Sequence, residues 1–218
     1  MIRVLLADDE ALIRAGIGTI LSADPGIEVV AEAGTGRQAV DLARRHRPDV
    51  ALLDIQMPDL DGLAAVPEIL RASPRTAVAI LTTFGQDDHI TRALDGGASA
   101  FLLKTAEPQE LMAGVRAVAD GGAFLSPRVA RRVITQLRER PASPARAARE
   151  RVAALSRREK DVLALLGAGR SNAEIARELH LAEDTVKAHV SAILARLDLR
   201  NRVQAAVLAH EAGISGRG

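Results

Sequence analysis

The stretch ALLDIQMPDLDG, residues 51–62, places a single carboxylate, Asp54, directly behind an apolar run and then turns the chain at Pro58 and Gly62. A short run that is apolar throughout is typical of a strand buried on both faces. An unpaired charge at the end of such a strand is costly. The stretch therefore predicts a buried strand whose last residue, Asp54, is compensated by an opposite charge or by a metal ion.

Apolar runs of this kind recur along the first 120 residues. They lie at 2–7, 27–33, 49–54, 77–83 and 99–104. Segments with the period of a helix alternate with them, at 10–21, 36–46, 62–70, 87–97 and 108–121. Such alternation predicts a doubly wound α/β fold, in which a five-stranded parallel sheet is covered by helices on both faces.

Parallel sheets of this class bind ligands beyond the carboxyl ends of their strands. Those ends carry Asp8, Asp9, Asp54, Thr82 and Lys104. Carboxylates that converge repel each other, so they take up protons or recruit a hard cation such as Mg²⁺. An Asp beside that cation, with a Lys and a Thr in reach, is placed for nucleophilic attack on phosphorus. Taken singly, each residue has an ordinary structural explanation as an alternative to a role in a site. An Asp pair often caps a helix, and a Lys is usually solvated.

Charge divides the chain into two unlike halves. Residues 1–122 hold 11 Lys and Arg against 18 Asp and Glu, a net charge of −7, whereas the remainder holds 18 against 10, a net charge of +8. A basic half favours a polyanionic partner, although drift of surface charge is the alternative. The absence of cysteine excludes disulfides and thiolate metal sites. With only three aromatic residues, stacking on single-stranded nucleic acid is disfavoured.

These features predict two domains joined by a linker. Residues 1–122 form the α/β domain, residues 123–152 form a partly helical linker that breaks at Pro141 and Pro144, and residues 153–218 form a small all-α domain. No apolar run is long enough to cross a membrane, and acids follow the first strand too soon for a signal peptide. We expect a soluble, cytoplasmic protein without membrane contact.

The last 63 residues have the pattern of four short helices. SRRE (156–159) and SNAE (171–174) are capping boxes that begin two of them. The tight turn HLAED (180–184) separates the second helix from a third, which carries basic residues, as in a helix-turn-helix. In that third helix Lys187 and Ser191 share one face, and Thr185 lies at the start, where phosphate contacts are common. Further phosphate contacts are expected from Arg196, Arg200 and Arg202.

Both halves resemble one known family. The N-terminal half resembles the receiver domain of bacterial two-component response regulators in four motifs, LLADDE (5–10), LLDIQMPDLDG (52–62), ILTTF (80–84) and GASAFLLKT (97–105). The C-terminal segment 155–206 resembles the LuxR-type helix-turn-helix of the NarL/FixJ subfamily. The resemblance implies a flavodoxin-like receiver and a phosphorylation-dependent transcription regulator.

The resemblance also assigns roles in the receiver. Asp54 is the phosphoacceptor, phosphorylated by a sensor histidine kinase, and Asp9, Asp54 and the backbone carbonyl of Gln56 bind Mg²⁺, with Asp8 helping through water. Thr82 moves toward the phosphoryl group, and Lys104 pairs with it. Phe101 turns inward as Thr82 moves, or is an ordinary core residue.

In the C-terminal half, the resemblance implies that Lys187, Ala188 and Ser191 reach into the major groove of double-stranded DNA. We expect phosphorylation to favour a homodimer. The last helix carries one stripe, formed by Val203, Ala206, Val207 and His210, which is either core or a dimer contact.

Two positions depart from the family pattern, and two other functions remain as alternatives. Thr105 stands where many receivers have Pro, and the bulky Phe84 is expected to slow hydrolysis of the phosphoryl group. A phosphorylation-independent regulator is one alternative. An Asp-nucleophile phosphatase is the other, disfavoured because such enzymes need a second Asp where this chain has Gln56. A flavodoxin-like cofactor site is disfavoured because the acidic DDE at 8–10 repels phosphate. We expect no catalytic turnover.

Overall fold

The computed structural model describes residues 1–83, 87–126, 129–130 and 144–215. These residues form two compact units, one built on Met1–Ala119 and continued by a short strand, the other built on the C-terminal helices. Among the described residues, no helix has the length and apolar content that a membrane span requires.

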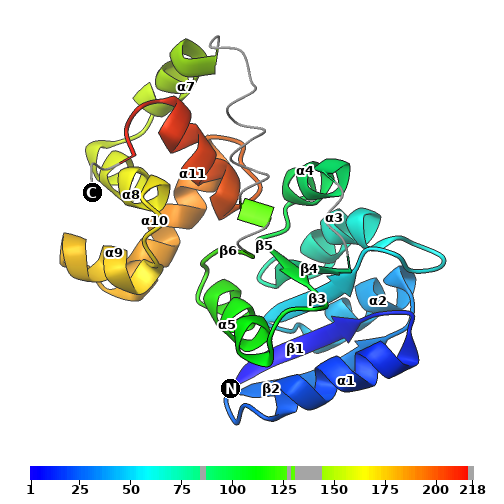
Figure 1. Cartoon of the computed structure of the whole chain (residues 1–218). Helices are drawn as coiled ribbons and strands as arrows, with labels where there is room; N and C mark the ends of the chain where they lie inside the picture. Colours follow the sequence, from blue (N-terminus) through cyan, green and yellow to red (C-terminus); the bar gives the residue numbers. More distant parts are fainter. Residues whose placement is uncertain (84–86, 127–128, 131–143, 216–218) are drawn as a thin grey trace. The chain divides into compact units, whose positions relative to one another are not determined.

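The first unit alternates strands and helices along the chain (Figure 1). Its strands are β1 (Ile2–Ala7), β2 (Ile27–Ala33), β3 (Val50–Asp54), β4 (Ala77–Thr82), β5 (Ala100–Leu103) and β6 (Phe124–Leu125). Its helices are α1 (Ala11–Ser22), α2 (Gly36–His46), α3 (Gly62–Ala72), α4 (Asp87–Gly96) and α5 (Pro108–Ala119). The strands pair in parallel in the order β2-β1-β3-β4-β5-β6, so their carboxyl ends share one edge.

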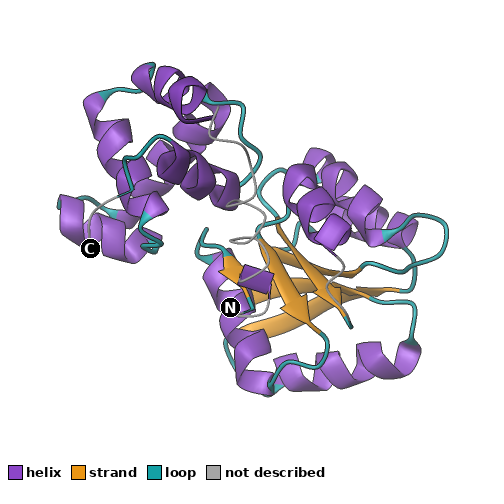
Figure 2. Ribbon diagram, turned by 45° about the horizontal axis from the view of Figure 1, so that its top comes forward, coloured by secondary structure: helices purple, strands orange, loops and turns teal. Residues whose placement is uncertain are grey.

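Helices cover both faces of this sheet (Figure 2). On one face, α1 and α5 pack against every second strand residue, including Leu6, Leu52 and Leu81. Helices α2, α3 and α4 lie in a row on the other face (Figure 1). The central strand β3 is buried over its whole length, as an apolar run flanked by two layers of helices requires.

The predicted doubly wound parallel sheet is confirmed. Each predicted strand and helix of this unit appears within two or three residues of its expected bounds. Within the described residues, the sheet has one strand more than the five expected, because β6 pairs with β5 through Phe124 opposite Ala100. A strand of two residues carries no period that a sequence pattern could reveal.

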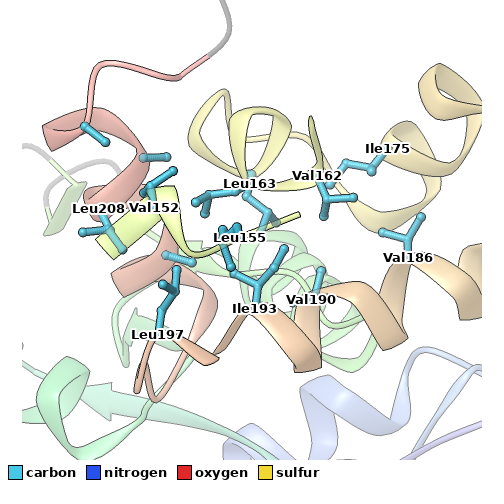
Figure 3. Close-up of a cluster of buried hydrophobic side chains, with 14 of the residues drawn as sticks. Val152, Leu155, Val162, Leu163, Ile175, Val186, Val190, Ile193, Leu197 and Leu208 are labelled. Carbon is cyan, nitrogen blue, oxygen red and sulfur yellow. The ribbon is translucent and has the colours of Figure 1, made fainter. Parts of the chain in front are cut away.

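The second unit consists of short helices around one apolar cluster. Its described helices are α7 (Pro144–Ala153), α8 (Arg157–Gly167), α9 (Asn172–Leu179), α10 (Glu183–Arg196) and α11 (Arg202–Glu211). Side chains from all of them meet in the core, among them Val152, Leu163, Ile175, Ile193 and Leu208 (Figure 3). The helix-turn-helix predicted from the sequence corresponds to α9 and α10.

Both predicted capping boxes are present. Ser156 and Glu159 begin α8, where each side chain accepts a hydrogen bond from the backbone N–H of the other residue. Ser171 and Glu174 do the same at the start of α9. The turn to α10 begins at His180, whose φ of 53° places it in the left-handed region.

The segment expected to be a linker, residues 123–152, contains two regular elements. Strand β6 joins the sheet of the first unit, and α7 packs into the second through Ala148 and Val152. Pro144, expected to break a helix, instead begins α7, where a proline has no backbone hydrogen bond to lose. The part of this linker before Pro141, which was expected to be helical, lies almost entirely outside the described residues.

Candidate functional site

Asp54 is the last residue of β3, at the edge where the parallel strands end. The residue is 6% exposed, and Oδ1 of its carboxylate accepts a hydrogen bond of 2.8 Å from the backbone N–H of Ile55. The chain then returns close to the strand, because Gly62 N–H donates to the carbonyl of Ile55. A Cβ atom at Gly62 would lie 1.9 Å from the carbonyl oxygen of Asp54, so the turn requires glycine.

Lys104, directly after β5, reaches two of the carboxylates. Its Nζ lies 2.7 Å from Oδ2 of Asp8 and 3.0 Å from Oδ2 of Asp54. Asp8 is fully buried, and the Lys104 side chain is 6% exposed. The ammonium group therefore supplies the opposite charge that the sequence required for Asp54.

Burial and pairing shift the pKa values of this pair. Burial raises the pKa of Asp54, and the hydrogen bond from Lys104 offsets the effect only in part. Burial lowers the pKa of Lys104, but the Asp8 and Asp54 carboxylates more than offset it, so this pKa lies above its usual value. Lys104 is thus held as a cation, whereas the negative charge on Asp54 is only partly compensated.

The chemistry of the donor set fits a hard cation. One ligand oxygen from each of Asp8, Asp9 and Asp54 lies within 4.8 Å of the others, and Asp9 is exposed where the other two are buried. Oxygen ligands grouped at this spacing, with one side open to solvent, suit Mg²⁺, which keeps several waters. A divalent cation would also balance the charge that Lys104 leaves uncompensated.

A hollow of about 310 Å³ opens over these groups. It is lined by five residues that were expected at the site, namely Asp9, Asp54, Gln56, Thr82 and Lys104.

Phe101 lies in β5 opposite Ile80 and is fully buried. This position is compatible with both expected roles of Phe101, the residue that turns inward and the ordinary core residue. No cis peptide bond occurs among the described residues, including the bond before Thr105. Phe84 lies outside the described residues.

His89, which was not among the residues predicted for the site, also lines this hollow. It lies in the first turn of α4, the helix that follows β4. The position of His89 could have been predicted, since a helix that begins after a strand starts at the carboxyl edge of the sheet. Attention to strand ends alone therefore misses residues supplied by the first turns of the helices.

In the second unit, α10 presents one polar face to solvent. Val186, Val190 and Ile193 of this helix are buried in the core. Four of the residues expected at DNA are exposed, namely Thr185, Lys187, Ala188 and Ser191. The Lys187 ammonium lies 3.4 Å from Glu183, an exposed pair that contributes little and is easily exchanged for a phosphate.

Arg202 does not belong to this exposed face. It is 7% exposed and donates hydrogen bonds to the side chain of Asn172, at 2.7 Å, and to the backbone carbonyl of Arg170. Burial lowers its pKa to about 10, which leaves it charged at neutral pH. The guanidinium of Arg202 is therefore engaged inside the unit, and the expected contact with DNA stays a prediction.

The two other arginines expected at DNA are exposed, and the stripe on the last helix is only partly buried. Arg196 is exposed but donates to buried Glu159 at 2.8 Å, and Arg200 is exposed. In α11, Val203 is buried, Ala206 and Val207 are partly exposed and His210 is exposed. The stripe on the last helix is thus core at one end and surface at the other.

Comparison with known proteins yields matches over nearly the whole chain. Residues 4–116 match the model of the response regulator receiver domain, and residues 153–209 match that of the luxR family of bacterial regulatory proteins. The transcriptional regulatory protein LiaR of Bacillus subtilis (strain 168) is 39% identical over 212 residues, which cover 96% of this chain and 97% of LiaR. The uncharacterized transcriptional regulatory protein YhcZ of the same organism is 36% identical over 214 residues, 98% of each chain.

Solved structures give the same result. The response regulator ChrA of a heme-sensing two-component system is 34% identical, with a TM-score of 0.53 over 98% of each chain. A LuxR-family two-component response regulator from Aurantimonas sp. SI85-9A1 is 28% identical, with a TM-score of 0.61 over 64% of this chain and 99% of that one.

Proposed function

Because the chain belongs to the response regulators that join a receiver domain to a LuxR-type DNA-binding domain, we propose that it regulates transcription under control of phosphorylation at Asp54. The phosphoryl donor is a sensor histidine kinase, and the target is double-stranded DNA, which implies work in the cytoplasm. The observation that carries the proposal is the contact of Lys104 with both Asp8 and Asp54 at the sheet edge.

Each residue at this edge of the sheet has a separate role in phosphorylation. An oxygen of Asp54 attacks phosphorus, and Lys104, 3.0 Å away, pairs with the negative charge of the bound phosphoryl group. Thr82, which lines the hollow, donates its hydroxyl to a phosphoryl oxygen, and Phe101 in the neighbouring strand repacks when Thr82 moves. Asp8, Asp9, Asp54 and the Gln56 carbonyl would hold Mg²⁺, which neutralises charge on the phosphoryl group when it is bound.

The phosphoryl group is stored rather than turned over. A phosphatase with an Asp nucleophile needs a general acid close to it, and Gln56, which lines the hollow at the expected position, has no proton to give at neutral pH. The relatives are named as transcriptional regulators, in agreement with this role.

Phosphorylation shifts the receiver between two states and favours a homodimer. Two copies of α10 then address two half-sites, each with Lys187, Ala188 and Ser191 toward the major groove and Thr185 toward a phosphate. The partly exposed end of α11, at Ala206, Val207 and His210, is the face we propose for the dimer contact.

The test compares two Asp→Asn variants of the full-length protein. Phosphoramidate and Mg²⁺ should add one phosphoryl group to the wild type and none to Asp54→Asn, measured by intact mass. The matched control is Asp59→Asn, since Asp59 is exposed and its φ of 65° is one that Asn tolerates. This control should be labelled like the wild type, and EDTA should prevent labelling of both. Equal labelling of wild type and Asp54→Asn contradicts the proposal.

A further inference from the structure

A second hollow adjoins the one over Asp54. Its volume is about 550 Å³, and it shares Asp9, Ile55, Gln56 and His89 with the first. Four residues line both hollows, so the two adjoin and together are called the depression, with Asp54 in the first hollow and Arg92 of α4 in the second. The transferred phosphoryl group needs only the part beside Asp54 and Lys104, so the remainder is free to hold the rest of a donor.

Charge along this depression is unevenly distributed. Carboxylates of Asp9, Glu10, Asp54 and Asp61 line it, and each repels an anionic donor. Lys104 is occupied by Asp8 and Asp54. Arg92 is exposed, lies one helical turn after His89, and is the one arginine among the described residues that line the two hollows.

We propose that Arg92, with His89 beside it, forms a subsite for the leaving group of an acyl phosphate donor. The inference rests on the proposed phosphorylation of Asp54. The leaving group of an acyl phosphate is a carboxylate. A guanidinium binds a carboxylate through two parallel N–H donors. Binding that strengthens as the leaving oxygen gains charge accelerates the transfer.

The transfer balances without a proton. A carboxylate oxygen of Asp54 attacks phosphorus, and the bond between phosphorus and the acyl oxygen breaks. The electron pair of that bond leaves on the acyl oxygen, so the products are the acyl phosphate of Asp54 and a free carboxylate. Phosphoramidate transfers the same phosphoryl group but releases ammonia, which has no negative charge for Arg92 to bind.

The difference between the two donors provides the test. Full-length protein with Mg²⁺ is incubated with acetyl phosphate or with phosphoramidate at equal concentration, and the initial rate of Asp54 labelling is measured by intact mass. In Arg92→Gln, the ratio of the acetyl phosphate rate to the phosphoramidate rate should fall about tenfold. Arg92→Lys, which keeps the charge but loses the two parallel donors, should give an intermediate ratio.

The control is Arg75→Gln, since Arg75 is an exposed arginine just before β4, at the opposite edge of the sheet. Its ratio should equal that of the wild type. An unchanged ratio in Arg92→Gln overturns the inference, and so does an equal fall with both donors, because that result indicates a general effect on the site. If neither donor labels wild-type Asp54, the proposed phosphorylation itself fails.

Discussion

At the scale of single residues, Gly62 shows how tightly the phosphoacceptor is held. The start of α3 passes directly against the end of β3, and a methyl group at this position would meet the backbone of Asp54 and Ile55 rather than a movable side chain. The backbone itself must therefore shift if any other residue is introduced. Such a shift moves the carboxylate of Asp54 relative to Lys104.

We expect Gly62→Ala to destabilise the receiver by about 1 to 3 kcal/mol, as overpacking of a filled site does. Urea denaturation measures the loss, and the labelling rate of Asp54 should fall with it. Gly16→Ala is the matched control, because Gly16 lies in α1 and its added methyl group has nothing within 4 Å. This variant should gain about 0.5 to 1 kcal/mol from helix propensity. Equal stability of the two variants contradicts the close approach at Gly62.

The same scale shows which part of the candidate site the sequence could predict. Asp8, Asp54 and Lys104 are brought together because parallel strands end at one edge, and this follows from the pattern of apolar runs. The surroundings of Arg202 could not be predicted, because a charge in the sequence gives no sign of its partners. Asn172 and the Arg170 carbonyl are 30 and 32 positions away in the chain and meet it only in the folded unit.

At the scale of helices, side chains from other elements hold the C-terminal ends of α9 and α10. The capping box at Ser171 satisfies the N-terminus of α9, and Arg158 of α8 donates to the carbonyl of Leu179 at its C-terminus, at 2.6 Å. Arg151 of α7 likewise donates to the carbonyl of Leu197, at the end of α10. A cation at a helix C-terminus is favourable on both hydrogen-bonding and dipole grounds.

We expect Arg158→Ala to lower the free energy of unfolding of the C-terminal unit by about 1 to 2 kcal/mol, because the Leu179 carbonyl loses a charge-assisted donor. Its neighbour Arg157, exposed at the first position of α8, provides the control. Arg157→Ala removes the same side chain and charge and should change stability by less than about 0.5 kcal/mol. Urea melts of the full-length protein, followed by helical circular dichroism, distinguish the two, and equal losses would show that the contact with Leu179 is not stabilising.

Long elements were predictable and short or partner-dependent ones were not. The strands around Asp54 and the helices α8 to α11 have a clear period or a capping signature. Strand β6 is too short for either, and the Pro, Ala and Arg composition around α7 is typical of a linker. The burial of Ala148 and Val152 against the C-terminal core, with the hydrogen bond from Arg151 to the Leu197 carbonyl, shows that α7 belongs to that unit.

At the scale of the whole molecule, the net charge of +8 after residue 122 overstates what is available to DNA. Arg151, Arg158 and Arg202 donate to backbone carbonyls within the second unit, and Arg196 pairs with Glu159. The expected phosphate contacts of one protomer are therefore few. We therefore expect a single unit to bind DNA weakly and a dimer on two half-sites to bind more tightly.

Salt dependence of DNA binding reports how many phosphates are contacted, with a slope of log affinity against log salt of about −0.9 for each one. If phosphorylation of Asp54 acts by favouring a homodimer, the slope should roughly double, since two copies of α10 then contact the duplex. An increase in the affinity of a single unit changes the intercept and leaves the slope as it was. The measurement is fluorescence anisotropy of a duplex selected from random sequence, with Asp54→Asn treated with the same phosphodonor as the control. A higher affinity at an unchanged slope would contradict dimerisation as the switch and favour release of a monomeric DNA-binding unit.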